Sequence, residues 1–194
     1  MQQLVFATNN AHKLGELRRM LAGRYRVVGL ADIGCHDDIP EDADTFEGNA
    51  LAKAQWVLDR YGLDCIADDS GLEVDALGGQ PGIHSARFAG TDHDDEASNA
   101  LLLSRLQGVT DRKARFRTVI ALARKGSEPL YFHGVVEGSI IDKPRGEAGF
   151  GYDPLFVPEG WSKTFAEASP DEKNAVSHRG RAVRELCRFL FRQH

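Results

Sequence analysis

The chain has 194 residues, of which 42% are hydrophobic and 27% are charged, and its formal net charge is −5. This is the composition of a globular domain with a sizeable core, and the negative charge argues against nucleic-acid binding through a basic surface. The start of the chain has neither a basic stretch nor a long apolar run, so we predict no signal peptide, no membrane partner and a cytoplasmic location. The three cysteines form no CxxC pair and are predicted to be reduced.

The N-terminal segment predicts a strand, a polar turn and a helix. Leu4-Val5-Phe6-Ala7 is a short apolar run typical of a buried strand, and Leu14, Leu17 and Leu21 follow at helical spacing. Asn9 or Asn10 is the natural N-cap between them. Lys13 falls in the first helical turn, where a cation opposes the helix dipole by roughly 0.3–1 kcal/mol. The turn is therefore either an ordinary cap or a phosphate cradle, although it lacks the glycines of a Walker A loop.

A second strand is predicted at 25–30, and the acidic segment 37–44 is predicted to be a solvated loop. Asp44-Thr45-Phe46-Glu47 then resembles a capping box, with Asp44 as the cap and Glu47 reaching back. Asn49 and Lys53 lie one turn apart on the helix that follows. We expect them either to point together into a cleft or to lie on an exposed helix face.

The chain is organised around residues 66–79. The apolar run Cys65-Ile66-Ala67 leads into Asp68 and Asp69, and residues 72–75 then alternate between apolar and acidic as a half-buried strand does. We expect the two carboxylates at the tip of a strand, before a turn that Gly71 allows. Two adjacent carboxylates repel each other, and Mg²⁺ would relieve this because it binds oxygen ligands. The alternative is an ordinary turn with Asp at its corner.

The second half of the chain continues with a loop rich in glycine and proline at 78–88, which contains Arg87, and an acidic start to a helix at 92–96. Residues 116–123 and 130–141 predict a β-hairpin, so we expect an α/β protein with a mixed sheet. Phe150 lies between two glycines, which would leave its ring open for a flat ligand to stack on unless it belongs to the core.

The C-terminal region predicts a short helix capped by Ser169 and a last helix capped by Ser177. His178, Arg179 and Arg181 lie in the first turn of that last helix, where cations have the wrong sign for the helix dipole. A surface helix can tolerate this arrangement. We prefer an anion or a carbonyl-rich ligand at that turn.

Five blocks of these residues stand in a fixed order along the chain. They are Thr8-Asn9-Asn10-Ala11-His12-Lys13, Pro40-Glu41 with Lys53, Ala67-Asp68-Asp69-Ser70-Gly71-Leu72, Phe150-Gly151-Tyr152-Asp153-Pro154, and Ser177-His178-Arg179. In this order and spacing they resemble the inosine/xanthosine triphosphate pyrophosphatase family, whose members remove non-standard purine nucleotides. Each block is weak alone, and the set is highly specific.

The resemblance implies one domain, residues 1–194, with two α/β lobes around a long central mixed β-sheet and the active site in the cleft between the lobes. It also implies a homodimer. The implied reaction is the hydrolysis of dITP, ITP or XTP to the monophosphate and pyrophosphate, with Mg²⁺ required.

The resemblance also implies a role for each matching residue. Asp69 and Glu41 would bind the metal, and Asp69 would also orient or deprotonate the attacking water. The phosphates would be held by Thr8, Asn9, Asn10, Ala11, His12 and Lys13, with further contacts from Lys53, Ser70 and Arg87. Phe150 would stack on the base, and Gly151, Tyr152 and Asp153 would shape that wall. Lys173, His178 and Arg179 would recognise the purine edge and exclude adenine.

Three rival interpretations remain open at this point. A Maf-like pyrophosphatase would act on other modified nucleotides, and a nucleotide sensor would bind without turnover. A purely structural module would leave the cations of the last helix unexplained. The acidic segment also leaves open whether Glu41 or a neighbouring carboxylate is the second metal ligand.

Overall fold

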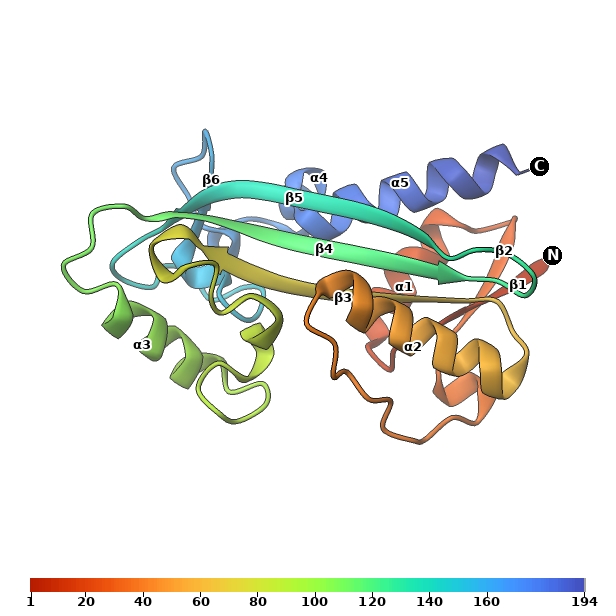
Figure 1. Ribbon diagram of the computed structural model, residues 1–194. Helices are drawn as coiled ribbons and strands as arrows, with labels where there is room; N and C mark the ends of the chain where they lie inside the picture. Colours follow the sequence, from red (N-terminus) through yellow and green to blue (C-terminus); the bar gives the residue numbers. More distant parts are fainter. Residues whose placement is uncertain (194) are drawn as a thin grey trace. The chain divides into compact units, whose positions relative to one another are not determined.

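A computed structural model describes residues 1–193 as a mixed six-stranded sheet with helices (Figure 1). The strand order is β2-β1-β3-β4-β5-β6. The strands are β1 (Gln2–Phe6), β2 (Tyr25–Val28), β3 (Cys65–Val74), β4 (Lys113–Ala123), β5 (Leu130–Ile140) and β6 (Phe156–Pro158). β1 pairs in parallel with both β2 and β3, whereas β5 and β6 pair antiparallel, so the predicted mixed sheet is confirmed.

Five α-helices accompany the strands among the described residues. They are α1 (Ala11–Met20), α2 (Phe46–Tyr61), α3 (Asp95–Arg105), α4 (Pro170–Val176) and α5 (His178–Arg192). Within residues 1–193, no helix is both long and apolar enough to cross a membrane. Cys35, Cys65 and Cys187 are free thiols and are buried, as the sequence predicts.

The chain divides into two compact units, each with its own core. Unit 1 comprises Met1–Asp69, Val119–His133 and Ala182–His194, and unit 2 comprises Ser70–Thr118 and Gly134–Arg181. The core of unit 1 gathers apolar side chains of β1, α1 and α5, including Leu4, Leu17 and Leu186. The core of unit 2 is built around aromatic and leucine side chains, including Phe116, Phe156 and Leu102.

The predicted helix caps are confirmed at most positions. The side chain of Asn10 caps α1, and Ser169 forms a capping box with Glu172 at the start of α4. The Ser177 hydroxyl accepts a hydrogen bond from the Gly180 N–H at 3.0 Å, which caps α5. The predicted cap of α2 lies one residue before the observed one. Thr45, not Asp44, accepts the hydrogen bond of the Gly48 N–H, at 2.9 Å.

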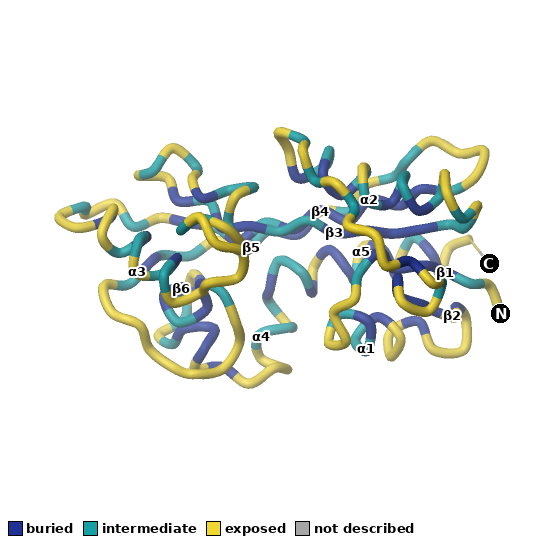
Figure 2. Tube along the Cα trace, turned by 90° about the horizontal axis from the view of Figure 1, so that it is seen from below, coloured by how far each residue is buried: buried dark blue, intermediate teal, exposed yellow. Residues whose placement is uncertain are grey.

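The prediction that Asp68 and Asp69 end a strand is wrong. Both lie inside β3, which continues through Gly71 to Val74 without a turn. Figure 2 shows most of this strand as buried, and the two residues of intermediate exposure at its centre are Asp69 and Ser70. The strand continues because Leu72 and Val74 fill the core of unit 2, so their burial outweighs the flexibility that Gly71 introduces. The alternation predicted for 72–75 is confirmed.

Candidate active site

In unit 1, the turn between β1 and α1 is organised by side chains that bind its backbone. The Asn10 Oδ1 atom accepts hydrogen bonds from the N–H groups of His12 and Lys13, at 3.0 and 3.1 Å. The Thr8 hydroxyl accepts one from the Asn10 N–H at 3.1 Å. Asn9, Asn10, Ala11 and His12 are exposed, so the predicted phosphate turn faces solvent at the N-terminus of a helix.

Two lysines of unit 1 converge on the central carboxylates. The Lys13 Nζ atom lies 2.8 Å from the Asp68 Oδ2 atom, although 55 residues separate them in the chain. The Lys53 Nζ atom forms an ion pair with Glu41 at 2.6 Å and donates a hydrogen bond to the Asp68 carbonyl at 2.5 Å. These contacts bring together four residues from three separate blocks of the sequence, namely Lys13, Glu41, Lys53 and Asp68.

Asn49 links the two predicted metal ligands indirectly. Its side chain is buried, and its Nδ2 atom donates a hydrogen bond to the Asp69 carboxylate at 3.2 Å. Its Oδ1 atom accepts a hydrogen bond from the Ala43 N–H at 2.9 Å, in the loop that carries Glu41. The sequence interpretation gave Asn49 no site role. The available signal was its position one turn before Lys53 on α2.

Burial and neighbouring charge both act on this cluster. Burial raises the pKa of Asp69 to about 6, with a further increase from Glu41 and Asp68, while Lys53 and the Asn49 hydrogen bond act in the opposite direction. Burial would lower the pKa of Lys53, but the surrounding carboxylates outweigh it and the pKa is raised. Lys53 therefore stays charged, and Asp69 is more basic than an exposed carboxylate.

The donor set of unit 1 fits one kind of divalent cation. Glu41 and Asp69 offer carboxylate oxygens, whereas no group of three or more His, Cys, Asp or Glu side chains within residues 1–193 is arranged to hold a metal. Mg²⁺ is commonly bound by one or two carboxylates together with substrate phosphates, which two carboxylates beside a phosphate turn can provide.

In unit 2, Phe150 is an exposed aromatic ring beside a lysine. The residue is 66% exposed, and the Lys173 Nζ atom lies 4.6 Å from its ring centroid. Lys173 is held in place by an ion pair with the buried Asp153, at 2.6 Å. Burial raises the pKa of Asp153 even though Lys173 and the Phe150 N–H favour its charged form. Because the Phe150 side chain is largely exposed, the interpretation of Phe150 as a core residue is wrong.

The glycines around Phe150 allow this loop to close on Asp153. Gly149 has a φ of +74°, and a Cβ atom added there would lie 2.2 Å from the Asp153 Oδ2 atom. The Phe150 N–H donates a hydrogen bond to that same oxygen at 3.1 Å. Tyr152 is buried, and its hydroxyl donates a hydrogen bond to the Ser85 carbonyl at 2.7 Å. The loop is thus a fixed support for an exposed ring.

The remaining predicted residues of unit 2 have different surroundings. The His178 ring stacks on Phe116, with centroids 4.9 Å apart, and Arg179 is half-buried beside it in the first turn of α5. Ser70 shares a hydrogen bond with the Thr118 hydroxyl at 2.7 Å. Arg87 is exposed at the end of a short 3₁₀ helix, Gly82–Arg87, and its ion-pair partner is Asp92, which is not a predicted site residue.

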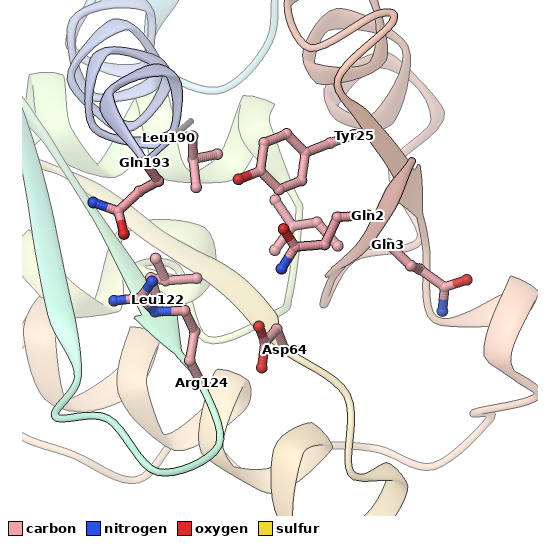
Figure 3. Close-up of a pocket in the computed structure, with 9 residues that line it drawn as sticks. Gln2, Gln3, Tyr25, Asp64, Leu122, Arg124, Leu190 and Gln193 are labelled. Atoms are coloured by element: carbon pink, nitrogen blue, oxygen red, sulfur yellow. The ribbon is translucent and has the colours of Figure 1, made fainter.

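A separate cavity of about 190 Å³ lies in unit 1 (Figure 3). It is lined by Gln2, Gln3, Leu4, Tyr25, Asp64, Leu122, Arg124, Leu190 and Gln193. Gln2, Tyr25 and Asp64 belong to the starts of the parallel strands β1, β2 and β3 or immediately precede them, whereas the phosphate turn follows the end of β1. None of the predicted site residues lines this cavity.

Unit 1 thus combines the N-terminus of α1, two lysines and a carboxylate cluster within β3. Unit 2 presents an exposed aromatic ring. The features of unit 1 are typical of an α/β protein that binds a phosphorylated ligand. The model of the Ham1 family matches residues 4–189, and the chain belongs to that family. The resemblance predicted from the five blocks is confirmed.

The similarity extends over nearly the whole chain. A dITP/XTP pyrophosphatase of Porphyromonas gingivalis is 53% identical over 191 residues, which cover 98% of each chain. One of Bacillus subtilis is 45% identical over 193 residues, again 98% of each chain. Among solved structures, the Ham1 protein of Staphylococcus aureus superimposes with a TM-score of 0.95 at 40% identity, covering 100% of both chains.

Proposed function

We propose that this protein hydrolyses dITP, ITP and XTP to the corresponding monophosphate and pyrophosphate. Full-length relatives at 45–53% identity are named dITP/XTP pyrophosphatases. The observation that carries the proposal is the cluster of unit 1. Lys13 forms an ion pair with Asp68, and Lys53 forms one with Glu41. Beside them lies Asp69, whose pKa is raised to about 6 by burial. The relatives' names give no support to a Maf-like enzyme.

The phosphates are bound by the turn and the lysines of unit 1. Thr8, Asn9 and Asn10 supply hydroxyl and amide groups, Lys13 and Lys53 supply charge, and the first backbone N–H groups of α1 add the positive end of its dipole. Ser70 and Arg87 are assigned further polyphosphate contacts. Much of the catalysis in such a site comes from positioning and charge stabilisation.

Asp69 is the catalytic base in this proposal. Without bound metal, burial raises its pKa to about 6, so it is ionised at pH 8 and available as a general base. Asn49 holds the carboxylate in place. Glu41 and Asp69 are the proposed ligands of Mg²⁺, which when bound would neutralise phosphate charge and favour attack at phosphorus.

The residues of unit 2 recognise the base. Phe150 stacks on the purine, and Gly151, Tyr152 and Asp153 hold the loop that presents it. Lys173, His178 and Arg179 are assigned the recognition of the 6-oxo group, because lysine and arginine only donate hydrogen bonds. Adenine carries an amino donor at that position and would leave these donors unpaired, at roughly 1–3 kcal/mol each.

We also propose a homodimer that acts on the cytoplasmic nucleotide pool. The support is the family resemblance. Light scattering of the purified protein tests the dimer, since a monomer at micromolar concentration would contradict it. The single domain spanning 1–194 and the cleft between two lobes stay predictions.

A panel of nucleotides tests the proposed function. Pyrophosphate release is measured for dITP, ITP, XTP, GTP, ATP and 5-methyl-UTP, each with Mg²⁺ and with EDTA. We expect kcat/KM for the first three to exceed that for ATP at least 100-fold, because two unpaired donors give discrimination of about that size. Preference for 5-methyl-UTP would favour a Maf-like enzyme, and binding without turnover would favour a sensor.

A further inference from the structure

Helix α3 contacts the loop that carries Phe150 through two residues for which the sequence suggested no role. Asp95 and Asn99 lie one helical turn apart, so their side chains leave the same face of α3. The Gly151 N–H donates a hydrogen bond to the Asp95 Oδ2 atom at 2.8 Å. The Asn99 Nδ2 atom donates one to the Gly151 carbonyl at 3.0 Å.

Three backbone groups of Phe150 and Gly151 are therefore bound by side chains. Asp95 and Asn99 hold both polar groups of Gly151, and Asp153 accepts the hydrogen bond of the Phe150 N–H at 3.1 Å. Gly151 has a φ of +60° and lies outside any helix or strand, so the regular pattern of secondary structure does not fix it. Since Phe150 is 66% exposed, contacts of its ring with the protein interior do little to fix its direction.

We propose that Asp95 and Asn99 are positioning residues that hold the Gly151 backbone from α3 and so fix the Phe150 ring for stacking on the purine base. This inference rests on the proposed function, because it gives the ring a base to stack on. Both residues belong to unit 2, as Phe150 does, whereas the proposed metal ligands and the phosphate turn belong to unit 1. The proposed role therefore concerns the base. They act through Phe150 and are not catalytic residues.

The surroundings of Asn99 favour this role over a purely structural one. Its Oδ1 atom is buried and has no hydrogen-bond partner among the described residues. A buried acceptor without a partner costs stability, and an apolar side chain at this position of α3 would avoid that cost. The bond from its Nδ2 atom to the Gly151 carbonyl is the compensating contact that the structure shows.

Binding of the two reaction products separates this role from a general effect on the fold. Inosine monophosphate carries the base, whereas pyrophosphate lacks it. We expect Asn99→Ala and Asp95→Ala to weaken the binding of inosine monophosphate about tenfold in calorimetric titrations, with pyrophosphate affinity unchanged. In steady-state kinetics kcat/KM for ITP should fall by a similar factor, mainly through a higher KM for ITP.

Two variants serve as matched controls. Glu96→Ala removes an exposed acid from the same first turn of α3, so it reproduces any effect of Asp95→Ala on the helix dipole. It should leave both affinities unchanged. Asp95→Asn keeps an oxygen acceptor for the Gly151 N–H and should restore most of the affinity lost in Asp95→Ala.

The outcomes distinguish this inference from the proposed function. Equal losses for inosine monophosphate and pyrophosphate, or an unchanged affinity for inosine monophosphate in both alanine variants, would overturn the positioning role. A wild-type protein that releases no pyrophosphate from ITP would instead overturn the proposed function. Loss of affinity in Glu96→Ala equal to that in Asp95→Ala would also count against the role of Asp95, because it would assign the effect to the helix dipole.

Discussion

Replacing Asp69 by Asn should lower activity and raise stability at the same time. The carboxylate is held inside β3 beside Glu41 and Asp68, and its pKa rises from 3.8 to about 6. The folded state therefore disfavours the ionised form, and stability is lost as the pH rises from the unfolded pKa through the folded one. The asparagine variant does not carry this cost.

The size of the gain follows from the pKa. A rise from 3.8 to about 6 corresponds to roughly 3 kcal/mol at 1.36 kcal/mol for each tenfold change in proton affinity. Because the carboxylate is only partly buried, solvent screening reduces this to about 1–2 kcal/mol. For a chain of this length that is about 3–6 °C in Tm. The gain in stability should be complete above about pH 7, about half as large at pH ~5, and absent below about pH 3.

Thermal unfolding of wild type and Asp69→Asn in EDTA, at pH 5 and pH 8, measures the effect without metal. Initial rates with ITP and saturating Mg²⁺ at pH 8 should show kcat at least ~10² lower in the variant. Asp44→Asn makes the same chemical change in an exposed loop and should alter neither quantity. A variant that is no more stable than wild type at pH 8 would refute the reasoning about burial. Near-wild-type turnover, with Asp68→Asn inactive, would reverse the roles within the pair.

Three further predictions concern the base, the loop and the metal. Arg179→Ala should lower kcat/KM for ITP far more than for ATP, and equal losses would withdraw its role in base recognition. Gly149→Ala places a Cβ atom 2.2 Å from the Asp153 Oδ2 atom at a φ of +74°, so kcat/KM for ITP should fall at least tenfold, with a lower Tm, as roughly 2 kcal/mol of strain would produce. EDTA should abolish pyrophosphate release and excess Mg²⁺ should restore it, whereas turnover in EDTA would exclude a required divalent cation.

Local features of the sequence predicted much of the fold. Asn10, Ser169 and Ser177 were recognised as caps because a cap is defined by residues within a few positions of itself. The same local rule failed at Thr45, where two possible caps are adjacent. It failed again at Gly71, because glycine permits a turn without requiring one. The strand continues there because Leu72 and Val74 are buried in the core of unit 2.

Contacts between distant segments could not be read from the sequence. The pair of Lys13 with Asp68 spans 55 residues, and the bond from Asn49 to Asp69 joins a helix to a strand. The bonds of Asp95 and Asn99 to Gly151 belong to the same class. The residue types of the candidate site were predicted through the resemblance, whereas the residues that hold them in place required the structure.

The central claim is that this site cleaves a purine nucleoside triphosphate in one step into monophosphate and pyrophosphate. The most direct test is to incubate the wild-type protein with ITP and Mg²⁺ in ¹⁸O-water and to weigh the products at early times. The account predicts inosine monophosphate and pyrophosphate in equal amounts, with one ¹⁸O atom in one of the two and no inosine diphosphate. Inosine diphosphate with free orthophosphate as the first products would contradict it.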